Sequence, residues 1–184
     1  MRISTKKICI TAAGIALFVA LSLCLQVPVF ENYYLCLGYV VLAVYCYSFG
    51  ALSGTAVGVL GVVLYCLVIS GLRGLPGWAL GNVVIGVTLG LVFRSTKTMR
   101  SALLRTALNA AAIVLSVTVG ILVVKSVTES ILYLQPFPVR AAKNFYAWAA
   151  DLVVLLLSLP ICMTLDKTVQ RMFSAPAKED AAHE

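Results

Sequence analysis

Long apolar runs, separated by short polar or glycine-rich segments, make up most of this sequence. Several runs are close to the roughly 20 residues that an α-helix needs to cross a bilayer core. Residues 35–72 contain no charged side chain, and one helix of that length would be roughly 57 Å long at 1.5 Å per residue. Because that is about twice the hydrocarbon thickness, the run is predicted to turn back at residues 48–50.

The pattern therefore predicts an all-α integral membrane protein, with six transmembrane helices in one compact bundle and a single membrane domain over residues 1–184. The helices are expected at residues 8–27, 35–48, 50–70, 76–93, 102–124 and 145–165. The mixed segment between the last two helices is expected to be a connection. Residues 166–184 are expected to form a polar tail.

The distribution of charge predicts the orientation of the bundle. The chain carries 14 lysines and arginines against 7 acidic residues. If the N-terminus is inside, ten of these basic residues fall in inner segments and four in outer ones, so both termini are predicted to be cytoplasmic. With 61% hydrophobic and only 11% charged residues, the chain does not have the composition of a soluble domain. The net charge of +7 is read as a topology signal and not as a nucleic-acid surface.

Several kinds of chemistry are excluded by what the sequence lacks. The only histidine, His183, lies in the polar tail, which removes histidine-based metal sites and Ser-His catalysis. The six cysteines show no C-x-x-C pair and mostly fall in apolar runs, as packing residues do. No P-loop is present, and the few charges within the spans do not form the relay of an ion-coupled transporter. No cofactor is expected.

Polar and aromatic residues gather at the expected outer ends of the helices. Trp78 and Asn82 are one turn apart, and Asn144, Trp148 and Asp151 follow at i, i+4 and i+7 on one face of the last helix. A carboxylate inside a membrane helix should face a partner or a wet cavity, so Asp151 is expected either to contact a ligand or to pair with a lysine. The aromatic side chains suit an interfacial belt or a pocket for a flat ring. The candidate substrate-binding residues are Glu31, Asn32, Tyr33, Trp78, Asn82, Lys125, Glu129, Lys143, Asn144, Trp148 and Asp151.

Small residues recur at every fourth position in two places. One stripe consists of Ala12, Ala16 and Ala20, and the other of Gly50, Gly54 and Gly58. Such stripes let helix backbones approach closely within a membrane. Each is predicted to be a docking face for a partner protein, with packing inside the chain as the alternative.

The chain resembles the substrate-binding S components of energy-coupling factor (ECF) vitamin transporters over nearly its whole length. The resemblance rests on the Ser-Thr-Lys-Lys start, the alanine stripe and the run GALSGTAVGVLGVVLYCLVISGLRGLPGWALGNVVIGVTLGLVFR. It implies a multi-pass protein of a prokaryotic plasma membrane that captures a micronutrient outside and docks on a membrane T-component driven by two cytoplasmic ATPases. It also implies that the alanine stripe faces the T-component, and that the outer ends of the fourth, fifth and sixth helices hold the ligand.

The cargo and the function class stay open at this point. The candidate residues suit a flavin, a pterin or a deazaguanine-like compound, while pantothenate could use Lys125, Lys143 or Arg73. Cationic ligands are less favoured. The alternative function is a small membrane scaffold that organises other proteins and carries no solute. A membrane enzyme ranks third, because no nucleophile–base pair is recognisable.

Overall fold

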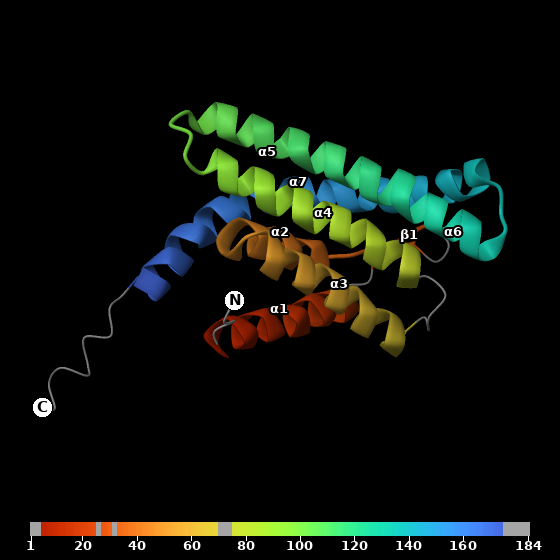
Figure 1. Ribbon diagram of the computed structural model, residues 1–184, viewed down its shortest axis with the longest axis horizontal. Helices are drawn as coiled ribbons and strands as arrows, with labels where there is room; N and C mark the ends of the chain where they lie inside the picture. The colour runs from red at the N-terminus through yellow and green to blue at the C-terminus, as the bar shows by residue number, and fades with distance from the viewer. Residues whose placement is uncertain (1–4, 25–26, 31–32, 70–74, 175–184) are drawn as a thin grey trace, which may run out of the picture.

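The computed structural model describes residues 5–24, 27–30, 33–69 and 75–174, and for residues 27–30, 33–34, 167 and 170–174 it describes the backbone alone (Figure 1). The helices are α1 (Thr5–Cys24), α2 (Gly38–Phe49), α3 (Ala51–Val68), α4 (Leu75–Thr96), α5 (Ala102–Val117), the π-helix η2 (Thr118–Lys125), α6 (Ser126–Tyr133) and α7 (Phe137–Ser174). Strands β1 (Val27–Phe30) and β2 (Tyr33–Leu35) form an antiparallel hairpin, in which Val27 pairs with Leu35.

The helical membrane fold is confirmed. Five helical stretches of the described chain are long and apolar enough to cross a membrane, with α5, η2 and α6 forming one of them from Ala102 to Tyr133. The shorter apolar helix α2 has 12 residues, fewer than the roughly 20 of a full crossing. The number of crossings and the orientation of the termini stay predictions.

The connection before the last helix is much shorter than expected. The helix that starts at Ala102 continues to Tyr133, and α7 already begins at Phe137. Leu134 ends the first of these helices in a left-handed conformation, at φ 52°, which is typical of a helix C-terminus. The polar residues of this segment had indicated a loop, but Lys125, Glu129 and Asn144 are buried on helices. The hairpin at Val27–Leu35 is the second difference from the sequence prediction, which placed only a link there.

Glycines bring α3 close to two of its neighbouring helices, α2 and α4. A Cβ added to Gly54 would lie 2.7 Å from the backbone nitrogen of Cys46 in α2, and one added to Gly86 would lie 2.7 Å from the Cα of Thr55 in α3. Gly58 is also buried, against Leu42 of α2. The prediction that Gly54 and Gly58 form a partner-docking face is therefore wrong, because both pack inside the chain. Gly50 joins α2 to α3 at φ +86°, a conformation that suits glycine.

The bundle has two distinct ends (Figure 1). The hairpin, α6 and the start of α4 lie at one end, called here the hairpin end. The start of α1, the end of α7 and the α4–α5 connection lie at the other, called the basic end because Lys97, Arg100 and Arg105 are there. Between the ends, fully buried apolar side chains such as Phe18, Leu89 and Leu155 form the core.

Candidate functional site

A chain of buried hydrogen bonds joins three helices at the hairpin end. The indole Nε1 of Trp78 donates to the hydroxyl of Tyr39 at 2.8 Å, and this hydroxyl donates to Oδ1 of Asn82, also at 2.8 Å. The amide Nδ2 of Asn82 donates to the backbone oxygen of Gly58 at 2.9 Å. These residues, called the Tyr39 network, link α2, α3 and α4. Tyr39 and Asn82 are fully buried, and such polar groups need partners because an open one is costly in an apolar interior.

Two opposite charges lie beside this network. Asp151 of α7 is 4% exposed and Lys125 of η2 is 9% exposed. The Asp151 carboxylate adjoins the Tyr39 hydroxyl and interacts electrostatically with Lys125. The ammonium of Lys125 lies 5.8 Å from the centre of the Trp78 ring. Asp151 therefore faces the interior of the bundle, where it has polar neighbours, and not the lipid.

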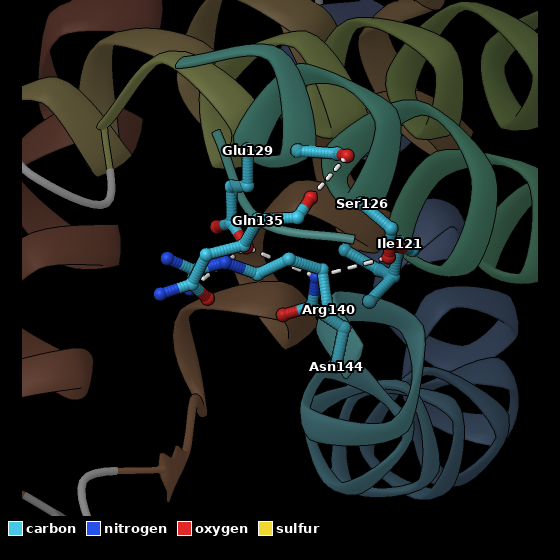
Figure 2. Close-up of polar contacts among 7 residues, drawn as sticks. Ile121, Ser126, Glu129, Gln135, Arg140 and Asn144 are labelled. Atoms are coloured by element: carbon cyan, nitrogen blue, oxygen red, sulfur yellow. Dashed lines mark hydrogen bonds and ion pairs between the residues drawn. The ribbon is translucent and has the colours of Figure 1, made fainter. Parts of the chain in front are cut away.

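A second polar cluster joins α6 to the start of α7 (Figure 2). Nδ2 of Asn144 donates to Ser126 Oγ at 3.0 Å and to Glu129 Oε2 at 3.1 Å. The guanidinium of Arg140 approaches the same carboxylate, with Nη1 3.8 Å from Oε2, and lies 4.6 Å from the centre of the Tyr133 ring. Oδ1 of Asn144 is buried and has no hydrogen-bond partner. This cluster, called the Asn144 network, therefore offers one open acceptor.

Trp148 connects α7 to the π-helix. Its Nε1 donates to Thr118 Oγ1 at 3.0 Å. Its ring stacks on Phe145, with centroids 5.2 Å apart and planes 29° apart, and Phe145 is itself exposed on the surface of the bundle. The position suits either role considered for Trp148, an interfacial aromatic or one wall of a ring-binding site.

The fold brings most of the predicted site residues to one end of the bundle. Trp78, Asn82, Lys125 and Asp151 surround Tyr39, while Glu129 and Asn144 form the neighbouring cluster. Lys143 is the exception, because it is exposed and lies one residue before the inward-facing Asn144; including it in the site is not supported by the fold. Glu31 and Asn32 lie outside the described residues, and Tyr33 is described only through its backbone in β2.

Two central residues of these networks, Tyr39 and Arg140, were not predicted as site residues from the sequence. Tyr39 was taken only as part of an apolar helix. A tyrosine in an apolar run usually needs a hydrogen-bond partner for its hydroxyl, so the residue type itself indicated a polar contact at this position. Arg140 was counted only as an outer basic residue. Arg140 is partly buried, and its Nε is shielded from solvent and has no hydrogen-bond partner. No sequence pattern marks that position.

A family model described as "ECF-type riboflavin transporter, S component" matches residues 2–167, nearly the whole chain. The chain belongs to this family. S components bind small vitamin-like substrates and pair with a T-component and ATPases of an ECF transporter; they are transport subunits and not enzymes. The resemblance stated from the sequence is thereby confirmed, as is the membrane character of the protein.

A solved structure supports the same fold for this S component. The chain is similar to the protein described as the S-component for biotin from an ECF-type ABC transporter, whose crystal structure was determined at 2.1 Å, with a TM-score of 0.61. The similarity covers 90% of this chain and 95% of the other, at 15% sequence identity. At that identity the likeness shows the fold and not the ligand. A comparison with curated proteins gives no match.

Proposed function

We propose that this S component captures riboflavin, or a closely related neutral flavin, outside a prokaryotic plasma membrane and delivers it inward by docking on a T-component with two ATPases. The observation that carries the proposal is the convergence of buried polar groups at the hairpin end. They come from α2, α4, η2, α6 and α7, as hydrogen bonds and electrostatic contacts between these elements record.

The charges of the site favour a ligand without net charge. Lys125 interacts electrostatically with Asp151, and Arg140 approaches Glu129, so each of these basic side chains lies beside a carboxyl group of the site. A charged ligand would leave an unbalanced charge in a poorly solvated site, which is costly. This balance disfavours pantothenate and cationic vitamins. The exposure of Lys143 removes one of the lysines that an anionic ligand could have used.

The side chains also suit the shape and hydrogen bonding of a flavin. An isoalloxazine is a flat ring system with a polar edge of carbonyl and N–H groups, and its ribityl chain carries hydroxyls. Trp78 and Tyr39 supply aromatic surface, while Asn82 and Asn144 supply amides. The open Oδ1 of Asn144 can accept a hydrogen bond from a ligand N–H or hydroxyl.

The orientation required for uptake follows from the positive-inside rule. Lys97, Arg100 and Arg105 lie at the basic end, which the rule assigns to the cytoplasm. The hairpin end, with the Tyr39 network, then faces outward and meets the solute first.

The surface of α1 supports docking through the alanine stripe. Ala12, Ala16 and Ala20 are exposed, whereas Gly14 and Phe18 face the bundle. The helix lies at the edge of the bundle and packs chiefly on α2 and α3. Its outer face is therefore open to another helix, which small side chains allow to approach closely.

Titration of the purified protein with riboflavin, followed by quenching of flavin fluorescence, tests the proposed ligand. We expect saturable binding of one riboflavin per chain, and no competition from pantothenate or thiamine. Tight binding of pantothenate or thiamine, with none of riboflavin, would show that the charge argument is wrong. A chain that binds no solute of this kind would instead favour the scaffold function.

A further inference from the structure

The face of α1 that packs on the bundle lies behind the alanine stripe. Three residues of this helix are buried, and they follow one another at steps of four: Gly14, Phe18 and Ser22. Two residues, each turning the helix by about 100°, separate every alanine of the stripe from the nearest of these three. The stripe and the buried residues therefore lie on nearly opposite sides of α1, and the packing of the buried side determines where the stripe points.

Phe18 fills a slot between glycines of two neighbouring helices. Its side chain is fully buried. A Cβ added to Gly38 of α2 would lie 2.9 Å from the Phe18 ring, and one added to Gly61 of α3 would lie 2.5 Å from it. Because Cβ atoms do not come this close to a packed ring, glycine at both positions leaves the room that Phe18 occupies. The ring is held from both sides, so the slot resists sliding and rotation of α1.

The other two buried residues of α1 contribute little side-chain volume. A Cβ added to Gly14 would lie 2.5 Å from the ring of Tyr45 in α2, so this glycine serves a close approach. The hydroxyl of Ser22 lies 3.2 Å from Sγ of Cys36. Within Thr5–Cys24, Phe18 is thus the only large side chain that is buried. It is the residue of α1 best suited to fix the helix on the bundle.

The same side chain contacts the candidate ligand site. The rings of Phe18 and Tyr39 meet edge to face, with centroids 6.3 Å apart and planes 68° apart. Tyr39 is the residue whose hydroxyl joins Trp78 to Asn82. Through Phe18, the helix that carries the alanine stripe is in direct contact with the Tyr39 network.

We propose that Phe18 is a positioning residue for docking, which holds α1 with the alanine stripe turned outward and joins this helix to the Tyr39 network. The inference rests on the proposed docking role of the stripe. It assigns part of that role to a residue that cannot touch the partner, because Phe18 is fully buried. A change at Phe18 should therefore weaken assembly and riboflavin binding together, whereas a bulky residue on the stripe should weaken assembly alone.

Disulfide formation tests the position of α1 without ligand or partner. Ser22→Cys places a thiol beside the native Cys36, since the Ser22 hydroxyl lies 3.2 Å from its Sγ. The exposed Cys9 and Cys24 are replaced by serine in this background. We expect the disulfide to form on mild oxidation, and to be largely lost when Phe18→Ala is added. Unchanged disulfide formation with Phe18→Ala would overturn the proposal.

A second substitution tests the fit between the ring and its slot. Gly61→Ala alone would place a methyl group 2.5 Å from the Phe18 ring, so it should displace α1 and weaken the same disulfide. In the double variant Phe18→Ala/Gly61→Ala, this methyl group takes part of the space that the ring has left. The disulfide should then return in part, as expected for two residues in contact. A double variant no better than the single ones would show that the slot does not position α1.

Co-purification and flavin titration test the consequence for function. We expect Phe18→Ala to lose most of the co-purifying T-component and to bind riboflavin more weakly. Leu89→Ala is the matched control, because it also opens a cavity at a fully buried position but lies on α4, and it should keep both properties. Wild-type assembly or wild-type riboflavin affinity in Phe18→Ala, or equal losses in Leu89→Ala, would overturn the proposal. If the wild-type chain binds neither riboflavin nor a T-component, the proposed function fails, and the disulfide alone then decides the role of Phe18.

Discussion

The indole nitrogen of Trp78 donates to the hydroxyl oxygen of Tyr39 across 2.8 Å and so ties α4 to α2 at the hairpin end. The same hydroxyl donates its proton to Asn82, so one oxygen satisfies two groups of α4. A buried polar group left without a partner costs about 1–3 kcal/mol. A ligand that binds here must therefore exchange hydrogen bonds with this network and leave none of them open.

Replacing Tyr39 by phenylalanine tests the network. The substitution removes the oxygen but keeps the ring, and leaves the indole N–H of Trp78 and Oδ1 of Asn82 without this partner. We expect the free energy of unfolding to fall by about 1–3 kcal/mol and riboflavin affinity to fall as well. Thermal unfolding and flavin titration in the same detergent measure both.

Tyr45→Phe is the matched control for this substitution. The Tyr45 hydroxyl donates to the backbone oxygen of Ile10 at 2.9 Å and is only partly buried. The control should lose less stability and keep its riboflavin affinity. Equal effects of the two substitutions on affinity would show that Tyr39 has no special relation to the ligand.

Replacing Asp151 by asparagine tests whether this carboxylate contacts the ligand or only stabilises the bundle. Asp151→Asn keeps the size of the side chain but removes the charge that faces Lys125. We expect riboflavin affinity to fall more than the melting temperature does, because the change upsets the charge balance of the site. Asp166→Asn serves as a control, since Asp166 pairs with Lys97 at 2.8 Å at the basic end. If Asp151→Asn keeps the wild-type affinity for riboflavin, the carboxylate has only a structural role as a partner of Lys125.

Docking on the T-component is expected to depend on the small outer face of α1. Ala16→Leu adds a bulky side chain to the exposed middle of the alanine stripe, which should keep a partner helix at a distance. Co-purification with the T-component and the ATPases should be lost, while riboflavin binding by the isolated chain is unchanged. Ala107→Leu, on the exposed face of α5, should leave assembly intact. Normal assembly after substitution of all three stripe alanines would contradict the docking role.

The helices could be read from the sequence because membrane length and apolar runs are coupled. An uncharged run too long for one helix had to turn back, and Gly50 marks that turn. The same reading failed at residues 125–146, since polarity there marks the inner face of helices and not a loop. Which residues of a helix face inward depends on its winding, and no pattern in the sequence predicts that residues 118–125 form the π-helix η2.

The candidate site was predictable where spacing alone places side chains on one face. Asn144, Trp148 and Asp151 share α7 as expected, and Trp78 and Asn82 share α4. The spacing could not show that Tyr39 joins these helices, because that contact depends on how α2 crosses α4. It also could not separate Asn144, which faces inward, from its neighbour Lys143, which is exposed. The role of Gly54 and Gly58 likewise depended on which helix lies opposite them.

Native mass spectrometry of the protein, gently extracted from its own membrane, tests the central claim most directly. The claim is that the buried polar groups at the hairpin end hold one neutral flavin. We expect a population of chains that carry one added mass equal to riboflavin, and loss of that mass in Tyr39→Phe and Asp151→Asn. Chains that stay empty after extraction from riboflavin-rich medium, or that carry a charged vitamin instead, would contradict the account.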